Sequence, residues 1–386
     1  MRVPVIDVET PILEWLLDPA DPALRTRVLL DLLDRPSDDD EVQHARRRIP
    51  DQPWVRATLA AHNGDGTWGR GFYHKYDGTS WVLLHLSEVG VPMDLPAIQA
   101  GVSRLIRTAR PIVKLAGARA APFRDLQDAV YWQLPIACLN AHMALVLIRA
   151  GLPDHAVTLA ALNLCRHRFQ PGRGFGCFVV DDSLLPACVM TVPKVLKAFL
   201  ALPPELRTPA DRSLIDDMVA VLKQFRLYRY VPEETGAWRE WAGSATPAER
   251  KTEKPRWIAA GRLEPRKEKE GWLRFSFPHS YNSDLLEVLL LLGEAGVECD
   301  GVMEEGLDAL LARRSRDGTW KMVGGLNGKM HADLDRKGKP SPWITYRALL
   351  AFKRFGRLNL PGPRTGPEDV RRKTPSGTGR SAPASG

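Results

Sequence analysis

Two short stretches of the sequence concentrate side chains that could act as acids or bases. The stretch FPHSYNSDLLE contains His279, Asp284 and Glu287, and its two acids are three residues apart, so a helix would place them on one face. The apolar surroundings of such a helix predict a raised carboxyl pKa, which a general acid needs. The stretch VVDDS pairs Asp181 with Asp182, whose mutual repulsion would also keep one carboxyl protonated. A helix cap, or an ion pair with Arg or Lys, would explain either stretch without catalysis.

A repeated turn carries further candidate residues. The tetrapeptide DGTW occurs at 65–68 and again at 317–320, and the related DGTSW occurs at 77–81. Asp-Gly favours a tight turn, and tryptophan supplies a large apolar body with a single N–H donor. We therefore expect a clamp, in which Trp68 or Trp320 covers the start of a helix and donates its N–H to a neighbouring repeat. Direct stacking of these tryptophans on a ligand is the alternative.

The helices that must position these residues fall into two classes. Six segments are apolar on most faces and most of them end near Gly or Pro, which is typical of buried helices. Five segments between them carry apolar residues at i, i+3 and i+4 and charges on the other face. This alternation predicts an all-α fold, an α/α toroid with about six inner and six outer helices. The buried segments are 21–33, 79–89, 136–150, 184–202, 281–295 and 343–355, and the amphipathic segments are 41–61, 95–109, 155–168, 212–227 and 303–313.

The inner helices of such a ring run parallel, so their N-terminal ends meet at one rim. Each end presents unpaired N–H groups and a partial positive charge, which favours anions such as diphosphate or carboxylate. Helix capping explains many of the polar residues at these entrances equally well. The predicted ligand-binding set consists of residues at the entrances and in the repeated turns: Trp68, Tyr76, Asp77, Trp81, Tyr281, Asn282, Trp320, Trp343 and Tyr346.

Charge and composition bear on the remaining functions. The net charge is +8, and segments 249–270 and 364–380 each contain three more Lys and Arg than Asp and Glu. Neither segment interleaves aromatic residues with its charges, as nucleic-acid stacking surfaces do, so nucleic-acid binding is the weakest hypothesis. We expect one domain over 1–360, in which the Trp-rich insertion 229–277 forms a lid, followed by a disordered basic tail over 361–386.

The cysteines and the N-terminal sequence favour a cytoplasmic location. The five cysteines, at 138, 165, 177, 188 and 299, include no CxxC pair and predict reduced thiols, not a metal site. The N-terminus lacks the features of a signal peptide, and the longest apolar runs fall well short of the roughly 20 residues that span a bilayer. We expect no cofactor, no metal and no transmembrane segment.

The repeated turns also support a family resemblance. DGTWG followed by a buried helix resembles the QW-type repeats of the terpenoid cyclase and protein prenyltransferase α/α-toroid superfamily. Within it, four stretches are similar to a bacterial squalene-cyclase-like, or prenyltransferase-like, group: DGTWGRGFYHKYDGTSWVLLHLSEVG, ACLNAHMALVLIRAGL, RFSFPHSYNSDLLEVLLLLGEAGV and RDGTWKMVGGLNGKMHADLDRKGKPSPWITYRALLAFKR. The resemblance covers about residues 10–357 and implies the toroid fold. The superfamily's DxDD and DDxxD motifs are missing, and Cys299, Asp300 and His331 lack the spacing of its zinc ligands.

Two functions follow as hypotheses. The first is binding of an isoprenoid or another long apolar ligand in a central cavity, with cyclisation or transfer of that ligand if the chain is an enzyme. The second is a non-catalytic scaffold that binds a protein or peptide partner. A deep apolar cavity lined by the inner helices would favour the first, and a filled centre would favour the second.

Overall fold

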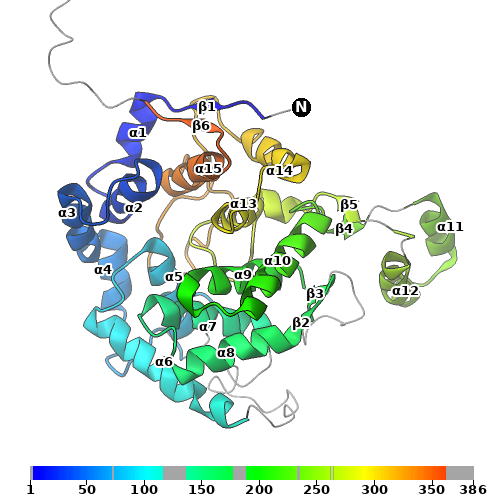
Figure 1. Cartoon of the computed structure of the whole chain (residues 1–386), viewed down its shortest axis with the longest axis horizontal. Coiled ribbons are helices and arrows are strands. Elements are labelled where there is room, and N and C mark those ends of the chain that lie inside the picture. Colours follow the sequence, from blue (N-terminus) through cyan, green and yellow to red (C-terminus); the bar gives the residue numbers. More distant parts are fainter. Residues whose placement is uncertain are drawn as a thin grey trace, which may run out of the picture.

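The fold is all-α, as the sequence predicts. The computed structural model describes residues 3–361 apart from 72–73, 116–135, 177–187, 233–234, 261 and 264. Within these residues the chain forms fifteen α-helices and six strands of two or three residues (Figure 1). None of the helices in the described segments is both long and apolar enough to cross a membrane.

The central helices are those with apolar residues on most faces. Every residue of α5 is buried, and α7, α9, α13 and α15 are buried along most of their length. An apolar surface on all sides is stable only when other helices cover it, which explains their central position. These inner helices are α2 (Pro22–Arg27) with the π-helical turn η1 (Val28–Leu32), α5 (Thr79–Val89), α7 (Ala137–Arg149), α9 (Thr191–Ala201), α13 (Leu285–Glu294) and α15 (Pro342–Arg354).

The amphipathic helices cover the inner ones. Helices α3, α6, α8, α10 and α14 pack against α2, α5, α7, α9 and α13 respectively, and Figure 1 shows α3, α6, α8 and α14 on the outside of the body. The predicted single helix over 41–61 is wrong, because Pro50 and Pro53 interrupt it with a 3₁₀ turn (Ile49–Asp51). The outer helices are α3 (Asp40–Arg48), α4 (Pro53–Ala60), α6 (Pro96–Leu115), α8 (Ala156–Arg168), α10 (Pro209–Gln224) and α14 (Gly301–Leu311), and α1 is Thr10–Leu16.

The inner helices contact one another in a continuous order. Helix α15 packs against η1 and α13, α13 against α9, α9 against α7, and α7 against α5. Gly90, which ends α5, lies so close to α2 that a Cβ on it would stand 3.1 Å from the Arg27 guanidinium. The parallel pair β1 (Ile6–Asp7) and β6 (Leu358–Asn359) joins the N-terminal segment to the end of α15. The inner segments therefore form one continuous series of contacts, from η1 through α15, α13, α9 and α7 to α5.

The first DGTW turn is a clamp between an outer and an inner helix. The Trp68 side chain is fully buried, and its Nε1–H donates to the Thr58 carbonyl at the end of α4, 2.8 Å away. The Trp68 backbone N–H donates to Thr79 Oγ1 at the start of α5, at 3.0 Å. Asp65 closes the turn by accepting hydrogen bonds from the Thr67 N–H and hydroxyl.

The second DGTW turn repeats the same contacts far along the chain. Trp320 is fully buried, and its Nε1–H donates to the Leu310 carbonyl at the end of α14, 2.9 Å away. Its backbone N–H donates to Thr345 Oγ1 in the first turn of α15, at 3.0 Å, and Asp317 accepts from Thr319. The predicted clamp is confirmed for both turns. Trp68 and Trp320 are therefore structural residues, and the predicted ligand contact does not fit their complete burial.

The insertion at 229–277 contributes two separate parts. Trp272 is fully buried in the main core, whereas Trp238, Trp241 and Trp257 form a small aromatic cluster of their own with Leu263. That cluster belongs to α11 (Gly236–Ser244) and α12 (Pro247–Ala259), which an antiparallel ribbon, β4 (Val231–Pro232) and β5 (Pro265–Lys267), joins to the body.

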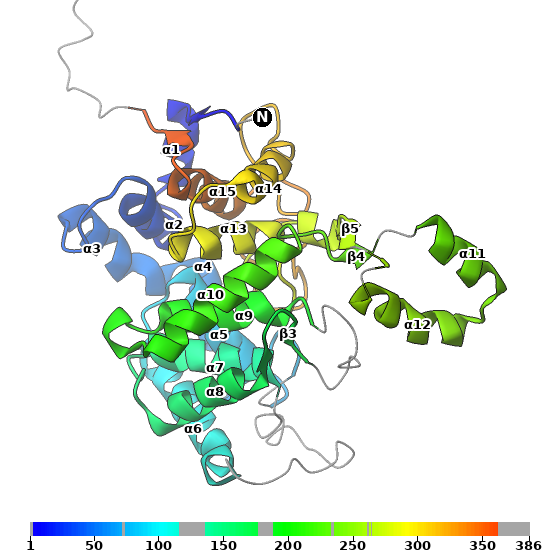
Figure 2. The same cartoon turned by 45° about the vertical axis from the view of Figure 1, so that its right-hand side comes forward.

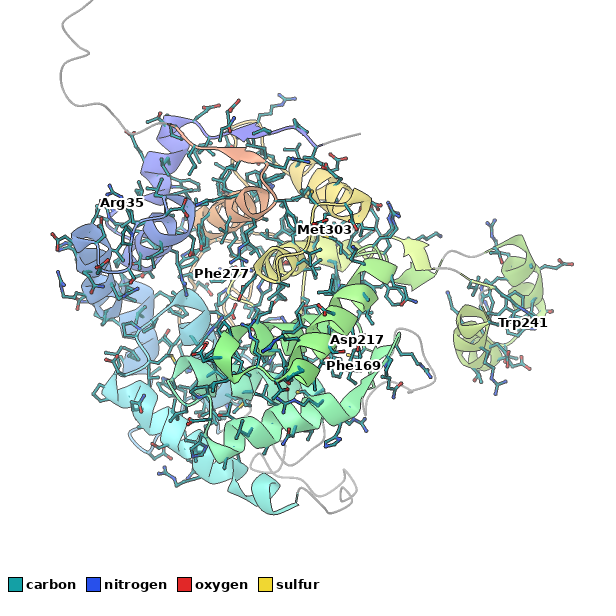
Figure 3. The ribbon with its side chains drawn as sticks, viewed as in Figure 1. Arg35, Phe169, Asp217, Trp241, Phe277 and Met303 are labelled. Atoms are coloured by element: carbon teal, nitrogen blue, oxygen red, sulfur yellow. The ribbon has the colours of Figure 1, made fainter. Side chains whose placement is uncertain are left out.

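The α11–α12 unit does not lie over the body as a lid. Figures 1 and 2 show both helices projecting away from it, and Figure 3 labels Trp241 on this projection. A further hairpin, β2 (Phe169–Gln170) and β3 (Gly174–Phe175), follows α8. The tail over 362–386 lies outside the described residues.

The start of α15 contains a titratable contact that supports a pH prediction. Ser341, the N-cap of α15, donates its hydroxyl to Asp335. Burial, with a smaller effect of the neighbouring Asp21 carboxylate, raises the pKa of Asp335 to about 6. Because the folded pKa lies above the unfolded value, the folded state holds this proton longer, and Asp335 lowers stability progressively as the pH rises from about 4 to about 6.

Replacing Asp335 with Asn is therefore expected to stabilise the protein at pH 7 more than at pH 4.5. The difference between the variant and the wild type should grow across this range by at most about 3 kcal/mol, since each pKa unit corresponds to about 1.4 kcal/mol. Urea unfolding of both proteins at several pH values measures it. A difference that stays constant with pH would contradict the assignment.

Candidate functional site

A buried carboxylate lies at the centre of the inner helices. Glu287, in the first turn of α13, is 1% exposed and accepts a hydrogen bond of 2.8 Å from Lys194 of α9, which is 2% exposed. Lys194 also donates to the Asn282 carbonyl at 3.1 Å. Lys197, one turn further along α9, forms a second salt bridge with Glu287. One buried carboxylate thus contacts two ammonium groups.

The network continues to a second carboxylate. Lys197 also lies 3.1 Å from Oε2 of Glu88, near the end of α5, and Arg149, the last residue of α7, donates to Oε1 of Glu88 at 3.0 Å. Glu88 is 9% exposed, and attraction to Lys197, Arg149 and Arg347 outweighs its burial and holds its pKa far below the usual range. Four inner helices, α5, α7, α9 and α13, therefore share one ionic network.

Asp284 and His279 form the other end of this network. Asp284 is the N-cap of α13: its Oδ1 accepts from the Glu287 N–H at 2.8 Å, and its Oδ2 accepts from the Ser276 N–H at 2.9 Å. His279 Nε2 lies 3.0 Å from Asp284 Oδ2, and the other ring nitrogen lies 3.3 Å from Arg347 Nη2 and 3.8 Å from Glu287 Oε1. The structure therefore brings together His279, Asp284 and Glu287, as the sequence predicts.

The electrostatics of the two acids differ from the prediction. Burial alone would raise the pKa of Glu287, but attraction to His279, Lys194 and Lys197 outweighs it and holds the pKa well below the usual range. Burial is likewise outweighed at Asp284, whose pKa is lowered by attraction to His279 and by the hydrogen bonds it accepts. The expected raised pKa is therefore wrong for both, and neither has the protonated carboxyl that a general acid needs.

A cavity of about 520 Å³ opens beside this network. All six inner segments contribute to its lining, largely through residues in their C-terminal halves. This differs from the expected site at the N-terminal rim. The lining residues are Arg27, Asp31, Glu88, Arg149, Lys197, Ala201, Phe277, Glu287, Leu290, Leu291, Glu294, Trp343, Tyr346, Arg347, Leu350 and Arg354.

Aromatic side chains form one wall of the cavity. Phe277 stacks on Trp343 with ring centroids 4.7 Å apart, and the Arg347 guanidinium lies over the Phe277 ring at 4.8 Å. Figure 3 labels Phe277 among the central helices. Trp343 donates its Nε1–H to Asp21 at 3.0 Å, and Tyr346 donates its hydroxyl to Asp31. Of the predicted ligand-binding residues, Trp343 and Tyr346 line this cavity.

Most of the charged side chains of the cavity neutralise one another. Glu88 pairs with Arg149 and Lys197, Glu287 pairs with Lys197, and Glu294 pairs with Arg354. Three lining residues have no salt bridge to any other residue that the structure describes: Arg27, Arg347 and Asp31. These three are the charges available to a ligand.

The remaining predicted residues lie at the opposite ends of the inner helices or outside the described residues. Lys75 lies 5.2 Å from the ring centroids of both Tyr76 and Tyr281, and Trp81 packs edge-on against His142 at 5.6 Å. Asp77 pairs with His74, and the Asn282 carbonyl accepts from Lys194. None of these lines the central cavity. Asp181 and Asp182 lie outside the described residues.

The sequence-based selection missed the charged residues on the inner helices. The missed residues share one signal: each is a charged side chain in an otherwise apolar helix, where it must find a partner or a ligand because an unpaired buried charge is costly. They are Arg27, Asp31, Glu88, Arg149, Lys194, Lys197 and Arg347.

Comparison of the chain with protein-family models, with curated proteins and with solved structures finds no match. The resemblance to the toroid superfamily therefore stays a prediction.

Proposed function

We propose that the chain is an α/α toroid whose central cavity binds a small molecule with an anionic head group and an apolar body. The continuous order of inner helices, each covered by an outer helix, supports the toroid. The DGTW clamps, which tie α4 to α5 and α14 to α15, fit repeated units of such a ring. The head group lies against Arg347 and Arg27.

The state of Arg347 is the observation that carries this proposal. Its guanidinium lines the cavity, and its Nε–H is buried without a hydrogen-bond partner in the part of the chain that the structure describes. Among those residues, the polar partner of its Nη2 is His279, and no carboxylate pairs with it. A guanidinium with unused donors suits a carboxylate or a phosphate, which accept such N–H groups in pairs.

The apolar body of the ligand lies against the aromatic wall. Phe277 and Trp343 offer a stacked pair of rings, and Leu290, Leu291 and Leu350 add aliphatic surface. An isoprenoid chain fits this surface and the superfamily resemblance. A wholly apolar ligand fits poorly, because it would remove water from the charged lining without replacing its hydrogen bonds.

The cavity supports binding more strongly than acid catalysis. The two carboxylates of α13 are held ionised by their partners, so neither supplies the proton that opens a cyclisation. We therefore propose a binding role for the cavity, in a cytoplasmic protein. The acids Asp284 and Glu287 stabilise the surrounding helices.

Replacing Arg347 with Gln is expected to weaken binding of geranyl phosphate about 10–150-fold, since a hydrogen bond to a charged group contributes about 1.5–3 kcal/mol. Geraniol, which has the same body without the charge, should bind the wild type far more weakly than the phosphate. Isothermal titration of both compounds measures these affinities. Arg212→Gln on the outer helix α10 is the matched control and should bind like the wild type.

Equal affinity for the alcohol and the phosphate would contradict an anionic head group. Unchanged phosphate binding by Arg347→Gln would contradict the assignment of Arg347. Circular dichroism of both variants shows whether the fold is retained.

A protein-binding role is the second candidate, and a specific observation favours it. The α11–α12 unit projects from the body with its own aromatic cluster, and Trp241 and Trp257 in it are partly exposed (Figures 1 and 2). Tryptophan is enriched at the centres of protein interfaces. Deleting residues 235–263 would then abolish partner binding and leave the central cavity intact.

A further inference from the structure

We infer that the ligand of the central cavity is a zwitterion, which carries a cationic group bound by Asp31 in addition to the anionic group bound by Arg347. This inference rests on the proposed function and deepens it. It concerns the side of the cavity formed by α2, η1 and α15. An ω-ammonium carboxylate with an apolar chain is the simplest ligand of this class.

The backbone around Asp31 is the first observation. Helix α2 changes into the π-helical turn η1 at Val28–Leu32, directly after Arg27. Short π-helical turns occur frequently at functional sites, because they reorient side chains relative to a regular α-helix. Here the turn accompanies two cavity-lining residues of opposite charge, Arg27 and Asp31, that do not form a salt bridge with each other.

Within the described residues, the Asp31 carboxylate forms no salt bridge with a Lys or Arg side chain. Its Oδ2 accepts the Tyr346 hydroxyl, a neutral donor. The nearby Lys353 ammonium is directed elsewhere: it donates to the backbone carbonyls of Asp31 and Leu32 and pairs with the Asp34 carboxylate at 2.7 Å. Within the described residues, Asp31 therefore lines the cavity as an anion without a charged partner.

Tyr346 fixes the role of Asp31 as an acceptor. Burial, and the neighbouring Asp31 carboxylate, raise the pKa of the Tyr346 phenol, while Arg27 and Arg347 oppose this rise only in part. The phenol consequently keeps its proton, and its O–H donates a hydrogen bond to Asp31. Tyr346 thus contacts Asp31 and lies near Arg27 and Arg347, the two arginines that form no salt bridge within the described residues.

A zwitterion gives each of these charged groups a partner of opposite sign. A simple anion bound at Arg347 and Arg27 would face repulsion from Asp31, and a second negative charge would increase that cost. An ammonium group would instead form a charge-assisted hydrogen bond with the carboxylate. Arg27, Arg347 and Asp31, which form no salt bridges within the described residues, therefore fit a ligand that carries both an anionic and a cationic group.

The test compares ω-amino acids, from 4-aminobutanoate to 8-aminooctanoate, with alkanoates of equal chain length by isothermal titration of the full chain. The wild type is expected to bind at least one ω-amino acid about 10-fold more tightly than its alkanoate, which is the effect of one charge-assisted pair. In Asp31→Asn, the ω-amino acid and its alkanoate should bind with equal affinity, and the affinity for the alkanoate should be no lower than in the wild type. Arg347→Gln should weaken both compounds.

The outcomes separate this inference from the proposed function. If alkanoates bind through Arg347 at least as tightly as every ω-amino acid, the zwitterion is wrong and the anionic site stands. If Asp31→Asn still prefers the ω-amino acid to its alkanoate as strongly as the wild type does, the assignment of Asp31 is wrong. The preference of the wild type tests the inference even if Asp31→Asn does not fold. If the wild type binds neither series but binds geranyl phosphate, the zwitterion is wrong and the anionic site stands; if it binds none of these compounds, both proposals fail.

Discussion

Replacing Glu287 with Ala is expected to lower the free energy of unfolding by about 3–5 kcal/mol, because removal of one member of a buried ion pair leaves the other charge uncompensated. Lys194 is 2% exposed and would lose its carboxylate partner, while Lys197 would keep Glu88. Burial already lowers the pKa of Lys194, and Glu287 opposes this change. Urea unfolding followed by circular dichroism measures the loss.

Two further variants make this prediction specific. Glu294, the last residue of the same helix, is 43% exposed and lies 3.5 Å from Arg354, so Glu294→Gln should cost less than about 1 kcal/mol. Adding Lys194→Met to Glu287→Ala should recover part of the loss, because the unbalanced ammonium is then removed. A loss below about 1 kcal/mol for Glu287→Ala, or no recovery in the double variant, would contradict the described network.

Replacing Trp68 with Ala is expected to destabilise the protein by about 3–5 kcal/mol, the usual cost of truncating a buried tryptophan. The cavity left behind would lie between α4, α5 and α6, since a Cβ on Gly101 of α6 would stand 2.7 Å from the indole ring. The Thr58 carbonyl would also lose its donor. Trp320→Ala should behave alike, since its contacts are the same.

Trp241 provides the control for the clamp. It lies in the aromatic cluster of the α11–α12 unit and outside the main core. Trp241→Ala should therefore leave the unfolding transition of the main body nearly unchanged. Thermal unfolding of the variants compares them, and equal losses for Trp68→Ala and Trp241→Ala would contradict the structural distinction.

The clamps and the inner helices could be predicted because their signals are local. Each of these signals depends on a stretch of about a dozen residues: the Asp-Gly turn, the apolar helix face and the glycine that ends a helix. Helix α5 begins and ends where the sequence places it, at Thr79 and Val89. The predicted start of α13 at Tyr281 is wrong, because Asp284 caps the helix by accepting the Glu287 N–H and the helix begins at Leu285.

The electrostatics of the site could not be predicted because they are not local. An acid on an apolar helix has a raised pKa only if no cation lies beside it. The cations beside Glu287 come from α9, about 90 residues earlier in the chain. Only the packing of α9 on α13 brings them together.

The position of the cavity also depends on tertiary packing. The sequence suggested the N-terminal rim of the inner helices, where helix ends attract anions. At the other ends, basic residues such as Arg149 and Arg354 are favoured by the helix dipole. The cavity lies among these basic residues, and it also reaches the stacked rings of Phe277, which precedes α13, and Trp343, in the first turn of α15.

Native mass spectrometry of the protein purified from its own host tests the central claim most directly. The wild type is expected to retain a small molecule that, once released, is detected as an anion, and Arg347→Gln prepared in the same way should lack it. A wild type that carries no ligand, a ligand without an acidic group, or equal retention by Arg347→Gln would contradict the claim that this cavity binds an anion through Arg347.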